Sequence, residues 1–112
     1  MFGFGKSANH REISASELQA GMAAGEVILV DVREPDEFAA EHIAGAVNCP
    51  LSGFDAAALP IAPGKTVVLQ CAGGKRSGMA LDKCAAARAA VDTHLGGGLA
   101  AWKAAGLPTV RR

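Results

Sequence analysis

The residues best suited to chemistry lie in one short segment, Cys-Ala-Gly-Gly-Lys-Arg-Ser-Gly, at positions 71–78. It follows an apolar run at 66–70 and precedes a stretch of good helix formers at 79–90. A free cysteine at the end of a strand is often only a small buried hydrophobic residue. Here the neighbouring cations and glycines favour a thiol with a pKa below the ordinary ~8.5, and the thiolate is the nucleophilic form. We therefore interpret Cys71 as a catalytic nucleophile.

The residues after Cys71 predict a loop that binds anions. Gly73 and Gly74 would let the backbone curl with its N–H groups facing inward, which creates a concave anion site. The helix that follows adds the positive end of its dipole, and Lys75 and Arg76 add full charges. Ser77 is expected to cap this helix and to give the thiolate a hydrogen bond. The predicted substrate-binding residues are Ala72, Gly73, Gly74, Lys75, Arg76 and Ser77.

The spacing within this loop separates two kinds of cysteine enzyme. Cysteine phosphatases place five residues between their cysteine and their arginine. Here only four residues separate Cys71 from Arg76, and Ser77 occupies the position of the phosphatase arginine. The smaller loop favours a different substrate.

The pattern of apolar residues predicts the elements that position this loop. The run at 27–32 is almost wholly apolar, as in a central strand of a parallel sheet, and the run at 66–70 is similar. Short strands are expected at 10–13, at the sheet edge, and at 47–48 and 92–95. Helices are expected after a Ser-x-x-Glu capping box at 14–17, from 34–38, over 79–90 and over 99–105, with a helical turn at 55–59.

Some polar residues have both a structural and a functional interpretation. Asp31 and Arg33 follow a predicted central strand, and ligands of open α/β sheets bind beyond the carboxyl ends of the strands. Both could support the site, although structural roles are favoured, with Asp31 binding loop N–H groups and Arg33 pairing with a carboxylate. His42 is interpreted as structural. His94 could point toward the loop as a base, but a structural role is favoured for it as well. The remaining cysteines, at positions 49 and 84, are interpreted as packing residues.

Composition limits the remaining possibilities. The chain has 112 residues, enough for one domain, with a tail expected at 1–9 and the domain at 10–112. Lys+Arg and Asp+Glu are equal at 11 each, which argues against a nucleic-acid partner. No apolar stretch is long enough to cross a membrane. Three cysteines without a Cys-x-x-Cys pair indicate neither a disulfide framework nor a zinc site, and they suit a reducing, cytoplasmic location.

Three segments together resemble the rhodanese family of single-domain sulfurtransferases. They are residues 31–48, beginning Asp-Val-Arg-Glu-Pro-Asp-Glu-Phe, the loop at 71–76, and residues 97–108, beginning Gly-Gly-Leu-Ala-Ala-Trp. The resemblance implies an α/β fold with about five mostly parallel strands and helices on both faces. It also implies that Cys71 carries the sulfur. Two departures are Cys49, where the family usually has an aliphatic residue, and the lack of the usual glycine after the helix at 79–90.

The resemblance implies a reaction as well. A sulfane sulfur would pass from thiosulfate or a persulfide donor to Cys71, and then to a thiol or cyanide acceptor. A sulfur-relay protein is a further candidate partner, and neither a metal nor an organic cofactor is required. The alternatives are a cysteine phosphatase or arsenate reductase, whose loops in this fold are one residue longer, and a non-catalytic module that binds anions or proteins.

Overall fold

The structure, a computed structural model, describes residues 10–111, and the tail predicted at 1–9 lies outside them. Within these residues one sheet holds five strands in the order β1-β5-β4-β2-β3. Every neighbouring pair of strands is parallel. The strands are β1 (Arg11–Ile13), β2 (Val27–Asp31), β3 (Val47–Asn48), β4 (Thr66–Gln70) and β5 (Thr93–Leu95). The predicted parallel sheet, with an edge strand near residue 11, is confirmed.

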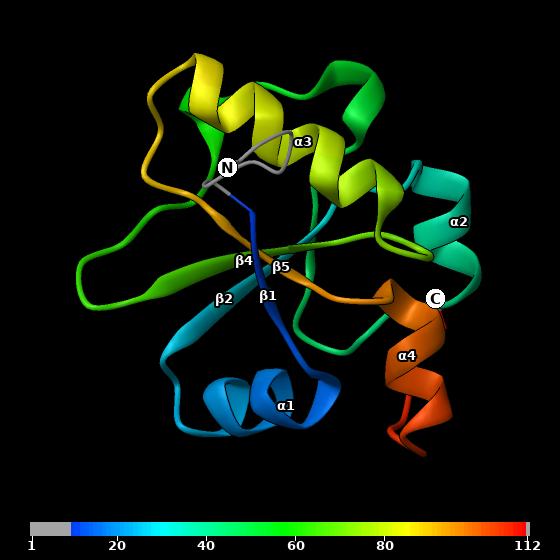
Figure 1. Cartoon of the computed structure of the whole chain (residues 1–112). Helices are drawn as coiled ribbons and strands as arrows, with labels where there is room; N and C mark the ends of the chain where they lie inside the picture. The colour runs from blue at the N-terminus through cyan, green and yellow to red at the C-terminus, as the bar shows by residue number, and fades with distance from the viewer. Residues whose placement is uncertain (1–9, 112) are drawn as a thin grey trace, which may run out of the picture.

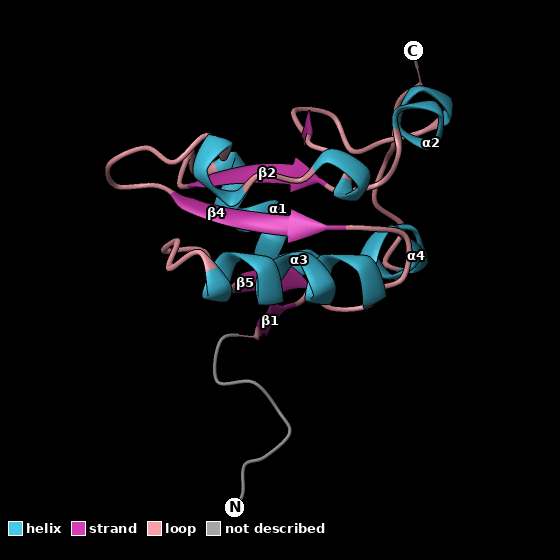
Figure 2. Cartoon of the chain, turned by 90° about the horizontal axis from the view of Figure 1, so that it is seen from above, coloured by secondary structure: helices cyan, strands magenta, loops and turns pink. Residues whose placement is uncertain are grey.

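Helices cover both faces of the sheet (Figures 1 and 2). Residues of α1 and α4 share one hydrophobic cluster, and residues of α3 and of the second 3-10 turn share the other. In Figure 1 α2 lies beyond the carboxyl ends of the strands, near the first turn of α3. The helices are α1 (Ala15–Ala23), α2 (Pro35–Ala40), α3 (Lys75–Ala86) and α4 (Gly98–Ala104), and the 3-10 turns are Leu51–Gly53 and Ala56–Ala58.

The middle of the central strand β4, from Val67 to Leu69, is apolar because it is buried on both sides. Successive side chains of a strand point to opposite faces of the sheet. Val67 and Leu69 accordingly join the cluster beneath α3, whereas Val68 joins the cluster beneath α1 and α4. Because both faces are covered, these three side chains are apolar, and the strand carries the chain through the core to Cys71, which follows its carboxyl end.

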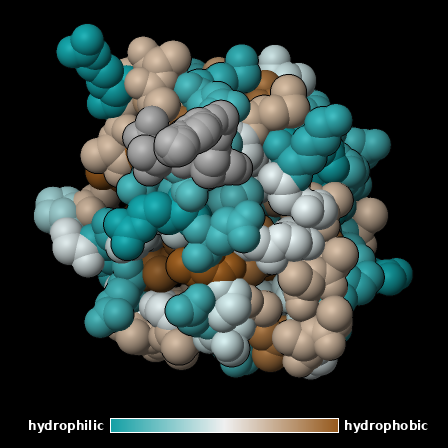
Figure 3. Space-filling view, viewed as in Figure 1, coloured by the Kyte–Doolittle hydropathy of each residue, from teal (hydrophilic) through white to brown (hydrophobic). Residues whose placement is uncertain are grey.

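The outer surface of the described residues is mixed in character. Figure 3 shows a face made mostly of polar and weakly hydrophobic residues, with a narrow strongly hydrophobic strip at its centre. Among residues 10–111 four large hydrophobic residues are exposed, and they lie on separate segments: Val47, Ile61, Met79 and Val110. No helix in residues 10–111 has the length and apolar character to cross a membrane.

The predicted start of α3 is wrong by four residues. The sequence favoured a loop as far as Gly78 and a helix over 79–90, but the helix runs from Lys75 to Ala86. Gly74 takes a φ of 108° and ends the loop, so the next residue is already helical. Gly78, although a poor helix former, lies within the first turns, where a side chain would approach the ring of His10.

The end of α3 has a left-handed residue that is not glycine. Arg88 has a φ of 58°. The N–H of Arg88 donates to Ala85 O, and the N–H of Ala89 donates to Cys84 O. This pair of bonds is the Schellman motif, whose left-handed position is usually glycine. Arg88 therefore takes the place of the glycine missing from the sequence pattern, in a left-handed conformation that is strained for a residue with a Cβ.

We predict that Arg88→Gly stabilises the protein. A left-handed conformation costs a residue with a Cβ roughly 1–2 kcal/mol, and the greater freedom of glycine in the unfolded chain offsets part of this gain. The free energy of unfolding in urea should rise by roughly 0.5–1 kcal/mol. Ala87→Gly is the matched control, because Ala87 is right-handed, and it should lower stability. An equal effect of both substitutions would contradict the strain at Arg88.

Candidate active site

Cys71 directly follows the carboxyl end of β4 and is almost fully buried, at 1% exposure. The N–H of Gly74 donates to its Sγ at 3.0 Å. Burial alone raises the pKa of the Cys71 thiol, but hydrogen bonds from the backbone N–H and the hydroxyl of Ser77 and from the N–H groups of Gly74 and Gly73 outweigh it. The pKa of Cys71 is therefore lowered overall. The thiol sits in an environment that favours the thiolate.

The first residues of α4 fix the orientation of the loop. The N–H of Leu99 donates to Cys71 O at 2.8 Å, and the N–H of Ala100 donates to Ala72 O at 3.0 Å. Gln70 Nε2 adds a second donor to Cys71 O at 3.0 Å. The carbonyl oxygens of the loop are thus held away from the sulfur. The two hydrogen bonds from α4 join residues 71–76 to residues 97–108, which are two of the segments that carry the family resemblance.

Gly98 makes this close approach possible. Its φ is +60°, and a Cβ at this position would lie 2.5 Å from Cys71 O and 2.7 Å from Ala72 O. No side chain fits at such distances without moving the loop.

Ser77 has a different role from the predicted cap. The N-cap of α3 is Gly74, and no side chain caps the helix. The Ser77 hydroxyl is instead fully buried and lies 3.6 Å from Cys71 Sγ, 3.1 Å from Gly74 O and 2.7 Å from His94 Nδ1. The predicted contact with the sulfur is present, whereas the predicted cap is wrong.

The two predicted cations are placed differently. Arg76 forms a two-pronged ion pair with Glu37 of α2, at 2.8 and 3.1 Å. The hydrogen bond from Arg76 is the main reason that the pKa of Glu37 falls to about 2, and the same bond raises the pKa of Arg76. Lys75 is exposed and lines a cavity of about 640 Å³ beside the loop. Positive charge remains at the site, but half of it is paired.

Asp31 and Arg33 form a buried ion pair with each other. Arg33 Nη2 lies 2.8 Å from Asp31 Oδ2, and the two residues are 5% and 0% exposed. The N–H of Arg33 also donates to Asp31, as expected of a carboxylate that organises a loop. Arg33 further donates to the carbonyl oxygens of Glu37 and Glu41. The pair thus holds α2 in place, and through Glu37 it supports Arg76.

The other residues singled out in the sequence lie away from the sulfur. His42 Nδ1 lies 2.7 Å from Phe38 O, and its ring stacks on Phe38 at 3.9 Å. Cys84 is fully buried in the core beneath α3, and Cys49 packs at its margin. Trp102 is buried and donates to Pro108 O at 2.8 Å, which anchors α4.

The sequence analysis missed one residue of the site environment and favoured a structural role for another. Glu37, which was missed, pairs with Arg76, and His94, which was considered as a base but interpreted as structural, lies against Ser77. No spacing in the sequence identifies Glu37, because it reaches the loop from another element. Among residues 10–111 no group of three or more His, Cys, Asp or Glu side chains could hold a metal ion.

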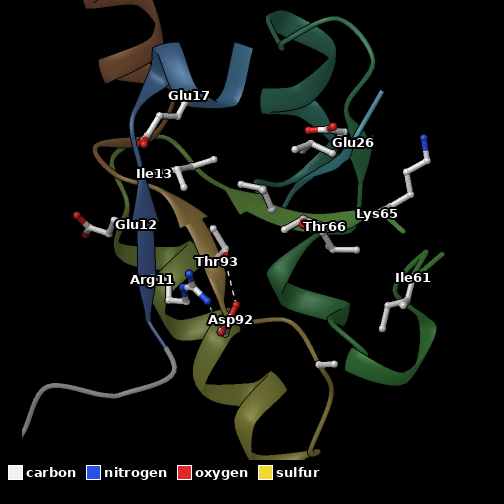
Figure 4. A pocket seen from close by; sticks show the side chains of 14 residues that line it. Arg11, Glu12, Ile13, Glu17, Glu26, Ile61, Lys65, Thr66, Asp92 and Thr93 are labelled. Atoms are coloured by element: carbon white, nitrogen blue, oxygen red, sulfur yellow. Dashed lines mark hydrogen bonds and ion pairs between the residues drawn. The ribbon is translucent and has the colours of Figure 1, made fainter. Parts of the chain in front are cut away.

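A second cavity, of about 620 Å³, lies at the other end of the strands, near their amino ends (Figure 4). Its lining includes residues at the amino ends of four strands: Arg11, Val27, Thr66 and Thr93. Cys71, in contrast, follows the carboxyl end of β4. This cavity is therefore separate from the candidate site, and its charges are mixed, with Arg11 and Lys65 among several carboxylates.

We predict that Gly98→Ala displaces the active loop. The added methyl group would overlap the carbonyl oxygens of Cys71 and Ala72. The alkylation rate of Cys71 by iodoacetamide should change, and the free energy of unfolding should fall by more than the roughly 1–2 kcal/mol of a left-handed alanine. Gly106→Ala is the matched control, because Gly106 has a φ of +77° with open space around it. If both variants behaved alike, the close approach at Gly98 would not matter.

Comparisons with known proteins agree with this geometry. The family profile described as Rhodanese-like domain matches residues 14–105. A rhodanese-related protein from Thermoplasma volcanium superposes with a TM-score of 0.77 and 28% identity, over 92% of this chain and 100% of that one. A thiosulfate sulfurtransferase from Pseudomonas aeruginosa superposes with a TM-score of 0.81 and 26% identity, over 91% of this chain and 20% of that one.

Other matches leave the activity open. A protein of unknown function from Rhodopseudomonas palustris, described as a possible tyrosine phosphatase, has a TM-score of 0.74 over 96% of this chain and 98% of that one. At 24% identity it shows the fold alone. An uncharacterised protein of Synechocystis is 55% identical over 85 residues, which are 76% of this chain and 48% of that protein. The chain spans about half the length of the curated relatives it matches.

Proposed function

The chain belongs to the family of rhodanese-like domains, and from this premise we propose that it is a sulfurtransferase that carries sulfur on Cys71. The observation that carries the proposal is the N–H of Gly74 at 3.0 Å from the Cys71 sulfur, within a loop of six residues from Cys71 to Arg76. Together with the N–H groups of Gly73 and Ser77, which also face the sulfur, it can stabilise a small anion bonded to that sulfur. A persulfide is an anion of this kind.

The first half of the reaction loads the enzyme. The Cys71 thiolate attacks the outer sulfur of thiosulfate, and a bond forms between Sγ and that sulfur. The sulfur–sulfur bond of thiosulfate breaks, and sulfite leaves with the bonding electrons. The charge moves from the thiolate to the terminal sulfur of the persulfide, so no proton is taken up or released. A persulfide donor would react in the same way and release its thiolate.

The second half returns the free thiolate. Cyanide or a thiolate acceptor attacks the terminal sulfur, takes it, and leaves the electrons of the broken bond on Cys71. Such a covalent route predicts ping-pong kinetics. The loop N–H groups lie where negative charge develops, and prearranged donors of this kind stabilise the transition state. Lys75 and Arg76 would attract the dianionic donor and stabilise the departing sulfite.

A cysteine phosphatase or arsenate reductase is the nearest alternative. The loop argues against it, since Arg76 comes one residue early and turns to Glu37. A non-catalytic binding module would have no use for a thiol whose pKa is lowered. Comparing hydrolysis of a phosphate ester with transfer from thiosulfate separates the enzyme classes.

We predict that thiosulfate adds one sulfur atom to the protein and that cyanide removes it. The intact mass should rise by one sulfur atom on incubation with thiosulfate and return with cyanide. Cys71→Ser should show no gain, because the nucleophile is missing. Cys49→Ser is the matched control, since Cys49 is half-buried at the margin of the core, and it should load sulfur as the wild type does. Loading of the Cys71→Ser variant would overturn the assignment.

We also predict opposite effects from the two partners of the ion pair beside the loop. Arg76→Gln removes a positive charge and should raise KM for thiosulfate, whereas Glu37→Gln leaves Arg76 unpaired and should lower it. Each change should be on the order of two- to five-fold, the size expected of a charge that is partly exposed. An uncharged sulfur donor is the control. If its KM changed as much as that of thiosulfate, attraction between charges would not be the cause.

A further inference from the structure

The hydroxyl of Ser77 links the nucleophile to a histidine. It lies 3.6 Å from Cys71 Sγ, which can donate to it, and 2.7 Å from His94 Nδ1. Ser77 is fully buried, and His94 of β5 is 5% exposed. The thiol and the hydroxyl beside it are thus largely screened from water, and the hydroxyl offers the thiol proton a route to the histidine.

The other nitrogen of His94 faces a carboxylate. His94 Nε2 lies 3.5 Å from Glu12 Oε2, on the neighbouring strand β1. A carboxylate at this position favours a proton on Nε2, which leaves Nδ1 of the neutral ring as an acceptor toward Ser77. Such an arrangement of nucleophile, base and carboxylate is the logic of a catalytic triad, with a serine hydroxyl inserted between the thiol and the ring.

Other charged groups also face this histidine. The cavity of about 640 Å³ beside the loop is lined by His94 together with groups of β1, its preceding residue and α3. The ring of His10 lies 6.0 Å from that of His94, and His10 Nε2 contacts Asp82 Oδ1 at 2.8 Å. The titratable lining residues besides His94 are His10, Glu12, Lys75 and Asp82.

We propose that Cys71, Ser77, His94 and Glu12 form a proton relay that generates the thiolate used in the proposed sulfur transfer. The Cys71 thiol gives its proton to Ser77 Oγ, and the Ser77 hydroxyl gives its own proton to His94 Nδ1. The products are a thiolate and an imidazolium, with one proton moved and no oxidation or reduction. The inference rests on the proposed function only in saying what the thiolate is used for. The proton relay itself can be tested by alkylation of Cys71, without any sulfur transfer.

The relay also explains how Ser77 stabilises the thiolate once it has formed. A hydroxyl has a single hydrogen, which in the resting state can point to Gly74 O or to His94 Nδ1. When His94 is protonated, its Nδ1–H donates to Ser77 Oγ, and the hydroxyl hydrogen is then free to turn to the sulfur. Ser77 becomes a donor to the thiolate. His94 and Glu12 are thus positioning residues that act through Ser77.

The test is the pH dependence of Cys71 alkylation by iodoacetamide, followed by intact mass. His94→Asn can accept a hydrogen bond from the Ser77 hydroxyl through its amide oxygen, as the neutral ring does, but cannot take the proton. The inflection of the rate should move to higher pH, and a shift of one pKa unit would lower the rate at pH 6 about tenfold. At high pH the rates should converge. Ser77→Ala should show the same displacement, and Glu12→Gln a smaller one because Glu12 is largely exposed.

His42→Asn is the matched control, since His42 is also a buried histidine but contacts Phe38 rather than the loop. Its profile should equal that of the wild type. An unchanged profile for His94→Asn would overturn the relay, and so would a rate lowered equally at all pH values, which indicates only a structural role. Failure of sulfur loading from thiosulfate alongside a displaced profile would reject the proposed function and retain the relay.

A second measurement does not require the histidine to be replaced. In nitrogen-15 spectra the neutral His94 ring should carry its proton on Nε2, and its titration should change when Cys71 is replaced by Ser. Identical titration of His94 in the wild type and in Cys71→Ser would show that the two groups are not coupled, and would overturn the relay.

Discussion

The active loop depends on two hydrogen bonds from the amino end of α4 to its carbonyl oxygens. A peptide group is planar, with its C=O and the following N–H pointing in opposite directions. When Ala100 holds the carbonyl oxygen of Ala72 against α4, the N–H of Gly73 must point the other way, toward the sulfur of Cys71. The orientation of the loop N–H groups toward the sulfur is therefore imposed from outside the loop.

The electrostatics of the site are local rather than global. The chain as a whole has no formal net charge, so attraction of an anion must come from N–H groups and cations near the sulfur. The buried ion pair of Asp31 and Arg33 acts on the loop indirectly, by holding α2 in place. A buried ion pair adds little net stability, but breaking one leaves an uncompensated charge, commonly at about 3–5 kcal/mol. By binding two carbonyl oxygens of the segment around α2, Arg33 fixes where Glu37 meets Arg76.

Burial of the nucleophile has two opposing effects. It removes Cys71 from water, which disfavours the thiolate, and it strengthens each hydrogen bond that the sulfur accepts. The balance lowers the pKa of Cys71, because several donors converge on one atom. The same burial makes an internal proton acceptor useful, and His94 lies within reach through a single hydroxyl.

The sequence by itself determined the parallel sheet, its central strands and the place of Cys71 directly after one of them. These are local properties, since apolar runs predict buried strands and a Gly-rich segment between strand and helix predicts a tight loop. It misplaced the start of α3, because only the folded loop shows that Gly74 completes the turn. The partners of Arg76 and Ser77 were decided by tertiary structure alone. Glu37 lies 39 residues from Arg76 and His94 lies 17 residues from Ser77, and such contacts arise only when parallel strands bring the ends of separate elements to one edge of the sheet.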